Sequence, residues 1–467
     1  MNFRINSKDK IGSNFGVFMD ILFLSVFGLI GLVYLFLGLF YSKGIKTNED
    51  YFLAGRKLSF FPLAFTLIAT QVGGGMMLGT AAESYKVGYF GIFYTLGMSL
   101  GFLILGLGVA SKLRSFNVVT TAQLFESKYN SVFLRKVASL ISIVTLFGLL
   151  CAQVVASRSV LLALGFSNDF VLIAFWLIVI FYTMIGGLRA VAATDTAQIL
   201  FLLTVFSVLF IKTLLAEPSS FFTFSSFVSR QGAFNSSNFS FLTLFPVIFN
   251  PMMFSLIEQD LAQRFFSART KRIAALGAVT ASAFLLLFSF IPVYFGMKAN
   301  LTSLFLPEGA NPLIVTIKSV ANRFFLSLIV TSIAAAVIST ADSLLCAISS
   351  NICQDFDFSF IKIKKVNFSK MVTLVVGLLA ILVAYFSNDI IGLLVQSYEL
   401  SISCLFVPFI FSYFKKSLNK NAAALSILLG LFGFFIFRLV YLPFPKELSS
   451  IILSLLGYFI GDKFLKK

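Results

Sequence analysis

The chain has no histidine, few cysteines and little charge. None of its 467 residues is histidine, which removes the commonest proton shuttle and metal ligand of proteins. Any ion coupling must therefore use carboxylates or a bound cation. The four cysteines, at positions 151, 346, 353 and 404, have neither CxxC nor paired spacing, so they indicate neither disulfides nor a zinc site. No nucleophile–base pair and no metal motif is visible, which argues against an enzyme.

Charge is scarce, while long hydrophobic runs are abundant. Charged residues form 12% of the chain, hydrophobic residues form 58%, and the mean hydropathy is +0.97. These values lie outside the range of soluble domains, so the sequence predicts an all-α polytopic membrane protein with no sizeable soluble domain. Runs long enough to cross a hydrocarbon core of about 30 Å predict thirteen transmembrane helices. They are residues 17–41, 60–82, 89–110, 137–164, 170–185, 196–216, 242–263, 274–298, 323–348, 371–387, 390–413, 421–441 and 447–463.

The excess of basic over acidic residues, 36 to 19, does not indicate a nucleic-acid partner. The lysines and arginines lie mainly in short loops between the expected spans, where they set membrane topology. They predict that the residue-60 end of the second span and the C-terminus are cytoplasmic and that the N-terminus is outside. Arg4, Lys8 and Lys10 conflict with this orientation of the first span. We expect a protein of the bacterial inner membrane whose first span is retained, since no small-residue cleavage site precedes it.

Two of the expected spans carry interruptions. Span 60–82 contains Gln71 and Val72 followed by three glycines, and span 242–263 contains Asn250-Pro251 and, further on, Glu258. Freed backbone inside a membrane must line a cavity or bind something. Breaks five spans apart, each at the start of a five-helix half, are typical of inverted-repeat transporters that bind substrate and ion near the midplane. The alternative is that the glycines serve helix packing and that the proline only kinks its helix.

Span 323–348 contains the stretch I-S-T-A-D-S at 338–343. A carboxylate near the centre of a membrane helix costs roughly 2.5–3.5 kcal/mol on insertion scales, so Asp342 is a functional-site hypothesis. Ala336, Ser339, Thr340 and Ser343 share one helix face, with Asp342 at its margin. Hydroxyls beside a carboxylate suit a hard cation such as sodium. The alternative is that these small residues only pack helices together.

Four segments make the chain resemble the sodium/solute symporter family. They are D-Y-F-L-A-G-R at 50–56, I-A-T-Q-V-G-G-G at 68–75, G-G-L-R-A-V-A-A-T-D-T-A-Q at 186–198, and I-S-T-A-D-S at 338–343. The resemblance implies a LeuT-like core of two inverted five-helix repeats. It divides the chain into an N-terminal tail (1–16), an extra helix (17–41), a first repeat with core helices 1 to 5 (60–216), a second repeat with core helices 6 to 10 (242–413), and two C-terminal helices with a short tail (421–467).

The resemblance also implies the ion sites. The principal sodium site would use the backbone carbonyls of Ala69, Val72 and Ala336 and the hydroxyls of Ser339 and Thr340. Some relatives have a second sodium site, which maps to Asp195, Ser339, Asp342 and Ser343. An acid at 342 stands where certain relatives have a hydroxyl, and it would either strengthen that site or create a titratable group. Two alternatives for Asp195 are a place on the ion's exit path and a pairing with an arginine such as Arg189.

Substrate contacts would come from the broken helices and their neighbours. The candidates are Gln71, Gly74, Gly75, Thr95, Gln153, Phe254, Ser255, Glu258 and Tyr398. Glu258 would hold an ammonium group or a cation, or would pair with Arg158 or Arg264 as a gate. The glycine-rich segment looks closest to the choline-transporting branch, but that branch has tryptophans at position 71 and near 258, and the only tryptophan here is Trp176. Choline is therefore not favoured, and proline-type, pantothenate-type and other small solutes remain open.

The function expected from these residues is sodium-coupled import of a small organic solute by alternating access. The partners would be that solute, the sodium ion and the lipid bilayer, with no organic cofactor; the sequence does not indicate an oligomeric state. The first alternative is proton coupling on the same fold through Glu258, Asp342 or Asp195. The second is a sensor or channel built on this scaffold.

Overall fold

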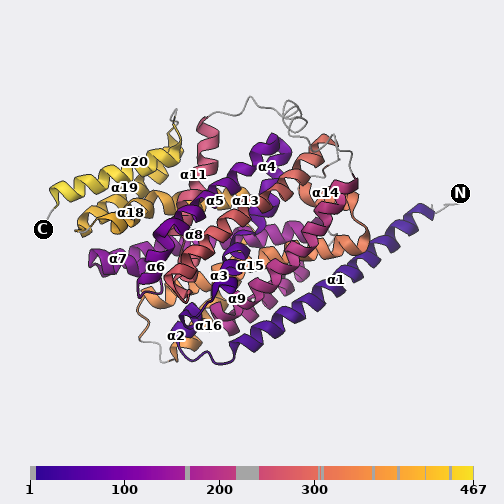
Figure 1. Ribbon diagram of the computed structural model, residues 1–467, viewed down its shortest axis with the longest axis horizontal. Helices are drawn as coiled ribbons and strands as arrows, with labels where there is room; N and C mark the ends of the chain where they lie inside the picture. The colour runs from indigo at the N-terminus through magenta and orange to yellow at the C-terminus, as the bar shows by residue number, and fades with distance from the viewer. Residues whose placement is uncertain are drawn as a thin grey trace.

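The described part of the chain is built from helices. The structure, a computed structural model, describes residues 7–163, 169–216, 241–302, 306, 310–359, 363–386, 390–415, 417–440 and 444–465. Within these ranges the one β-type contact is a bridge between Leu58 and Ala268. Figure 1 shows the helices as a bundle, with α1 along one side and the C-terminal hairpin α19–α20 at the other.

Each of the thirteen expected spans coincides with helix. The first half comprises α1 (Ser7–Ser42), α2 (Asn48–Leu53), α3 (Phe60–Gln71), α4 (Thr80–Val87), α5 (Phe93–Ile104), α6 (Ala110–Ser115), α7 (Thr121–Tyr129), α8 (Val132–Ala163) and α9 (Asp169–Ala216). The second half comprises α11 (Phe241–Ile257), α12 (Gln259–Ser267), α13 (Lys271–Leu301), α14 (Pro312–Val320), α15 (Arg323–Asp355), α16 (Lys365–Ala384), α17 (Ile390–Ser401), α18 (Val407–Phe414), α19 (Lys420–Leu439) and α20 (Lys446–Phe464).

The number of membrane spans is not confirmed as thirteen. Among the described residues, nine helices are long and apolar enough to cross a membrane by length and composition. Two of these nine extend over more than one expected span. Gly75–Ser115 contains span 89–110 and the end of span 60–82, and Asp169–Ala216 contains spans 170–185 and 196–216. The apolar helices Phe60–Gln71 and Leu244–Ile257 are too short to be counted because breaks end them. The boundaries of the two repeats remain a prediction.

Gly187 explains how α9 holds two spans. Its φ of +51° is a left-handed conformation inside an otherwise helical stretch, and a Cβ there would lie 2.4 Å from the carbonyl oxygen of Tyr51. Only glycine fits such a close approach. Tyr51 belongs to the D-Y-F-L-A-G-R segment, whose Ala54, Gly55 and Arg56 have φ values of 48°, 65° and 57°. This segment is therefore a tight corner that packs against the bend in α9.

The interruption of α3 lies where the sequence predicts it, but that of α11 does not. The helix α3 ends at Gln71, and after Val72, Gly73 and Gly74 the chain re-enters helix as the π-helical turn η2 (Gly75–Gly79). By contrast, α11 runs through Pro251 without ending, so the expectation of a break at Asn250-Pro251 is wrong. The chain breaks instead at Glu258, whose ψ is 127°. A membrane helix tolerates proline where neighbours satisfy or cover the freed groups, and here α5 covers that stretch through Gly97, whose Cβ would lie 2.1 Å from the Ile248 carbonyl.

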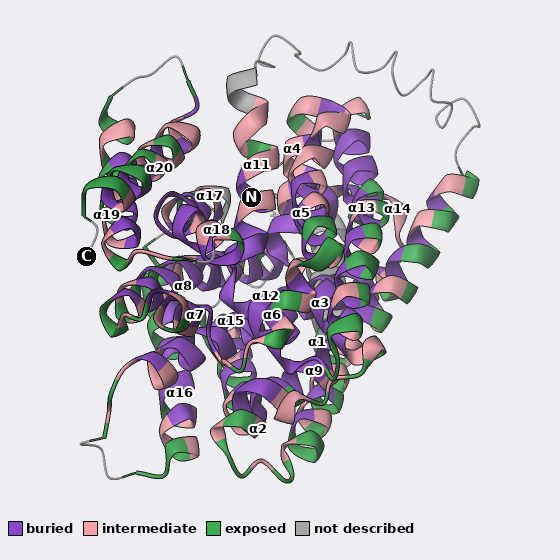
Figure 2. Ribbon diagram, turned by 60° about the vertical axis from the view of Figure 1, so that its left-hand side comes forward, coloured by how far each residue is buried: buried purple, intermediate pink, exposed green. Residues whose placement is uncertain are grey.

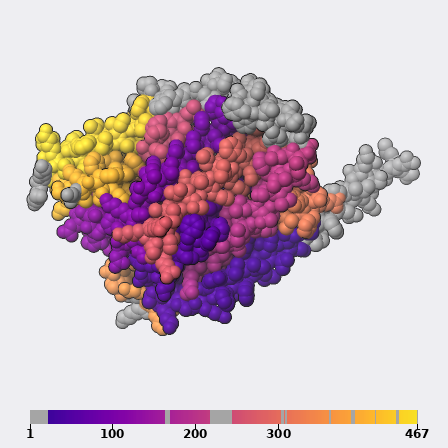
Figure 3. All heavy atoms as spheres, in the orientation of Figure 1, coloured from indigo at the N-terminus to yellow at the C-terminus, as the bar shows by residue number. Residues whose placement is uncertain are grey.

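The core of the molecule lies around α15. In its most apolar window 78% of the residues are buried, against 17% for α1, and Figure 2 shows the buried residues concentrated around α15 and α8. The helix α15 packs against α8, α9, α3 and α16. In the space-filling view, α1 and the C-terminal hairpin cover opposite sides of the molecule (Figure 3). The polar I-S-T-A-D-S stretch therefore lies inside the core, where all of its residues except Thr340 are buried.

Candidate functional site

The broken end of α3 meets the polar face of α15. The last carbonyls of a helix lack hydrogen-bond donors within that helix. At the end of α3, two hydroxyls of α15 donate hydrogen bonds to such carbonyls. The Ser339 hydroxyl donates to the Ala69 carbonyl at 2.8 Å, and the Thr340 hydroxyl donates to the Thr70 carbonyl at 2.9 Å. These contacts join two helices that are 270 residues apart in the sequence.

Glycine makes this approach possible. A Cβ at Gly73 would lie 2.2 Å from the Thr340 hydroxyl oxygen, and one at Gly74 would lie 2.6 Å from the Ala156 side chain. The Gly74 N–H donates to Gln153 on α8 at 3.1 Å. The unwound stretch is thus enclosed by α15 on one side and α8 on the other.

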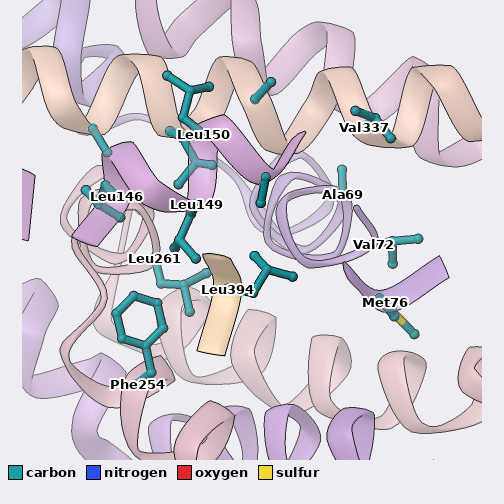
Figure 4. Close-up of a cluster of buried hydrophobic side chains, with 14 of the residues drawn as sticks. Ala69, Val72, Met76, Leu146, Leu149, Leu150, Phe254, Leu261, Val337 and Leu394 are labelled. Carbon is teal, nitrogen blue, oxygen red and sulfur yellow. The ribbon is translucent and has the colours of Figure 1, made fainter. Parts of the chain in front are cut away.

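Oxygen atoms from four of the five predicted sodium residues converge here. The Ser339 hydroxyl lies 2.8 Å from both the Ala69 and the Ala336 carbonyl oxygens, and the Thr340 hydroxyl lies 3.3 Å from the Ala336 carbonyl. Val72, fully buried, caps α3 with non-helical backbone (φ −78°, ψ 62°). Figure 4 shows apolar side chains around this junction, including Val72, Met76, Val337 and Leu394. Oxygen ligands in an apolar surround suit a hard cation, so the residues present fit sodium.

A second polar cluster surrounds Arg264, which is fully buried on α12. Its Nε donates to the Thr66 hydroxyl at 2.9 Å, and its Nη2 lies 3.4 Å from Oδ2 of Asp195. The same Nη2 donates to the Ser343 hydroxyl. Asp195 therefore pairs with Arg264 and not with Arg189, which the sequence offered as its partner.

Asp342 lies beside this cluster with a different partner. The Tyr182 hydroxyl of α9 donates to Oδ2 of Asp342. Oδ1 of Asp342 is buried and has no hydrogen-bond partner among the described residues, and the same holds for Oδ1 of Asp195. The Ser343 hydroxyl, which donates to the Ser339 carbonyl at 2.6 Å, links this region to the first cluster. The sequence did not identify Thr66, Thr70 or Tyr182; as polar residues inside predicted spans, they carried a weak signal.

Several substrate candidates line a small cavity next to the break in α3. The cavity has about 30 Å³ of space for water, and its lining includes Gln71, Gly75, Gln153, Glu258 and Tyr398. Gln71 lies 3.4 Å from Glu258 and donates to its carboxylate. A ligand pocket commonly measures about 300–1,000 Å³, so this conformation holds at most one or two waters there. The lining also includes residues that the sequence did not identify, among them Tyr94, Met98 and Leu394.

The other substrate candidates lie outside this lining. Phe254 packs on Tyr398 with ring centroids 4.6 Å apart, and Gly74 contacts Gln153. Thr95 and Ser255 face other partners: the Thr95 hydroxyl lies 3.3 Å from that of Thr80, and the Ser255 hydroxyl donates to a carbonyl of its own helix.

Glu258 has neither of the arginine partners that the sequence offered. Arg158 lies 3.8 Å from Asp169, and Arg264 is engaged by Asp195. The interaction of Glu258 with Gln71 joins the two helix breaks directly. Glu258 is therefore a buried acid at the second helix break whose carboxylate accepts from Gln71 at the first.

A larger vestibule adjoins the small cavity. It measures about 370 Å³ and shares Gly75, Tyr94, Leu394 and Tyr398 with the cavity lining. The Tyr94 and Tyr398 hydroxyls lie 2.8 Å apart and join α5 to α17 across the boundary. The vestibule lies toward the α4 end of the bundle, which the topology prediction assigns to the outside.

Polar contacts close the opposite end of the bundle. Asp355, at the end of α15, accepts from Arg135 of α8 at 3.0 Å and from Thr120 at 2.8 Å. Arg135 also pairs with Glu126 of α7 at 2.7 Å. The chain is therefore held together at this end, while the vestibule lies at the other.

Comparison with known proteins decides the family. The model of the sodium:solute symporter family matches residues 51–430. The chain belongs to this family. It is 26% identical to a sodium/proline symporter of Staphylococcus aureus (strain JH9) over 443 residues, which covers 87% of this chain and 83% of the relative.

Solved structures agree on the fold of this sodium:solute symporter family member. A Na⁺-coupled sialic acid symporter in a substrate-bound outward-open state superposes with a TM-score of 0.80 at 19% identity, covering 94% of this chain and 97% of that chain. A nucleobase-cation-symport-1 family transporter in a closed conformation gives a TM-score of 0.58 at 14% identity, covering 88% and 94%. The family, the LeuT-like fold, the multi-pass membrane architecture and the assignment as a transporter rather than an enzyme are thereby confirmed. The ion and substrate residues remain predictions.

Proposed function

We propose that this protein is a sodium-coupled symporter that imports a small zwitterionic solute by alternating access. The observation that carries the proposal is the convergence of Ala69, Ala336 and Ser339 oxygens at the junction of α3 and α15. A cation bound there would tie the two helices together. The state of the sodium site would thereby be coupled to the shape of the adjacent solute cavity.

The sodium ion would be held by the carbonyls of Ala69, Val72 and Ala336 and the hydroxyls of Ser339 and Thr340. In this structure the two hydroxyls donate to helix carbonyls. On sodium binding, each hydroxyl would rotate to direct a lone pair at the ion, and the carbonyls would coordinate it. The burial of Ser339 and Val72 supports this role, because water does not compete for the ligands there.

The solute would bind between the two helix breaks. We propose that its ammonium group contacts Glu258, whose carboxylate is buried and bonded to Gln71. The resemblance to sodium/proline symporters agrees with an amino-acid-like solute. Since the cavity near Glu258 is too small for such a molecule in this conformation, binding requires Tyr94 and Tyr398 to separate and join the cavity to the vestibule.

Sodium coupling is energetically adequate for nutrient scavenging. One charge crossing 100 mV contributes about 2.3 kcal/mol, and a tenfold sodium gradient adds about 1.4 kcal/mol. Their sum, about 3.7 kcal/mol, supports roughly 500-fold accumulation of a neutral or zwitterionic solute per sodium ion.

The test is uptake by the purified protein in proteoliposomes. Thermal stabilisation across a panel of amino acids, betaines, vitamins and sugars, with and without sodium, selects the solute. Uptake of that labelled solute is then driven by an imposed sodium gradient or by a pH gradient in sodium-free buffer. We expect uptake only with sodium. Equal uptake when potassium replaces sodium would contradict the proposal, uptake with the pH gradient alone would indicate proton coupling, and currents beyond transporter turnover would indicate a channel.

A further inference from the structure

The buried arginine beside the sodium site bears on ion stoichiometry. Asp195, Asp342 and Arg264 are all fully buried, and Asp195 and Asp342 belong to the set that the resemblance maps to a second sodium site. We infer that the guanidinium of Arg264 takes the place of a second coupling cation, so that one sodium ion accompanies each solute. This inference rests on the proposed sodium coupling and specifies how many ions it uses.

The guanidinium is surrounded by oxygen atoms in the way that a bound cation would be. Nε contacts the Thr66 hydroxyl, Nη1 contacts the Asp260 carbonyl at 3.0 Å, and Nη2 contacts both Asp195 and the Ser343 hydroxyl. A hard cation at this position would use the same carboxylate and hydroxyl oxygens. The guanidinium therefore contacts the oxygen atoms that a second cation would use, and does not merely lie near them.

The carboxylate oxygens that remain without partners do not supply a second site by themselves. One oxygen of Asp342 accepts from Tyr182, so Oδ1 of Asp342 and Oδ1 of Asp195 are the two carboxylate oxygens of this cluster without a partner among the described residues. Two oxygens are too few to replace the hydration shell of sodium. A second sodium ion would also approach the fixed charge of Arg264 in a low-dielectric interior, where like charges repel strongly.

The guanidinium differs from an exchangeable ion because its tether to α12 prevents it from leaving with the solute. Through the Ser343 hydroxyl, which also donates to the Ser339 carbonyl, it contacts the scaffold of the sodium site. It can thus neutralise Asp195 in every transport cycle without being transported.

Removing the guanidinium should open a second cation site. In Arg264→Met, the oxygens of Asp195, Thr66 and Ser343 lose the guanidinium and become available beside the unpartnered oxygen of Asp342. We expect this variant to bind and transport a second sodium ion. Arg264→Lys keeps a positive charge and should retain a count of one. Arg269→Met removes an exposed arginine five positions away and serves as the matched control.

The number of sodium ions per solute is measured in proteoliposomes with the membrane potential clamped at zero. A tenfold sodium gradient is imposed, and the opposing solute gradient is varied until net solute flux stops. One sodium ion per solute balances a solute gradient of about tenfold, and two balance about a hundredfold. We expect about tenfold for the wild type, Arg264→Lys and Arg269→Met, and about a hundredfold for Arg264→Met. Arg264→Gln, which retains hydrogen-bond donors, replaces Arg264→Met if that variant fails to insert.

Each outcome bears on the inference. A wild-type ratio near a hundredfold would overturn it, as would an Arg264→Met or Arg264→Gln ratio that stays near tenfold. Adding Asp195→Asn to Arg264→Met should restore the ratio to about tenfold, since the new ion loses its main ligand; a double variant that stays near a hundredfold would also overturn it. Absence of any sodium-driven flux in the wild type is a different result, because it would refute the proposed function itself.

Discussion

Ser339→Ala is the sharpest perturbation of the proposed sodium site. Its hydroxyl lies 2.8 Å from both the Ala69 and the Ala336 carbonyl oxygens, and Ser339 is 1% exposed. The substitution removes one proposed ion ligand and one contact between α3 and α15, with little change in volume. Its effects on sodium affinity and on stability can therefore be estimated separately.

The loss in sodium affinity should exceed the loss in stability. A hydrogen bond to a charged group contributes about 1.5–3 kcal/mol and a neutral one about 1 kcal/mol. A lost ion ligand of the first kind raises the sodium concentration for half-maximal uptake by about 10- to 150-fold. In sodium-free buffer the variant should lose only about 1 kcal/mol of stability. Adding Thr340→Ala should nearly abolish sodium-driven uptake while the protein still inserts into the membrane.

The control is Ser332→Ala on the same helix. Ser332 is equally buried, but its hydroxyl donates to the Ile329 carbonyl of its own helix at 2.7 Å. The initial rate of solute uptake is measured across a sodium titration for the wild type and both variants, alongside thermal melts with and without sodium. If Ser339→Ala shifts the sodium dependence no more than Ser332→Ala does, then the polar face of α15 only packs helices, and the reasoning fails.

Three further predictions concern the solute, the gate and the fold. Glu258→Gln should raise the KM for an ammonium-bearing solute by about 10- to 150-fold, because a charge-assisted contact is lost. The thermal stabilisation by sodium should stay near the wild-type value. An unchanged KM would exclude Glu258 as the ammonium partner. Tyr398→Phe removes the hydroxyl contact with Tyr94 and should open the cavity more often. The measurement uses a protein without its native cysteines and with one cysteine introduced into the cavity lining, which an impermeant thiol reagent should label faster in the variant. An unchanged labelling rate would show that this pair does not close the cavity. Gly187→Ala should sharply reduce the amount of folded protein in the membrane, since its Cβ would lie 2.4 Å from a carbonyl oxygen, whereas Gly28→Ala, with nothing within 4 Å, should be tolerated; equal yields of the two variants on fluorescence size exclusion would contradict the packing argument.

Much of the fold could be predicted from the sequence because a bilayer leaves few alternatives. Each apolar run must be helical to satisfy its backbone, and each expected span indeed coincides with helix. The glycine run after Gln71 also marked a real break, because three glycines remove the side chains that would otherwise fill the space. Pro251 misled the prediction: a proline removes one hydrogen bond, and its helix continues where a neighbouring helix packs closely enough against it.

Arg264 marks the limit of prediction for the site. The sequence singled it out only as one of two arginines, with Arg158, that could pair with Glu258. The break at Glu258 re-orients α12, so that Arg264 reaches Thr66, Asp195 and Ser343 on three other helices. Helical periodicity cannot give that direction, because it depends on backbone angles at a single residue.

The sequence by itself determined the membrane class, the helical content, the family resemblance and the residues with oxygen atoms suited to a cation. These properties follow from composition and local spacing, which the chain carries without any long-range contact. Only the tertiary structure decided which of those oxygens meet. It joined Ser339 to Ala69 and brought the guanidinium of Arg264 to Asp195, because these contacts connect helices far apart in the sequence whose relative positions are set by packing.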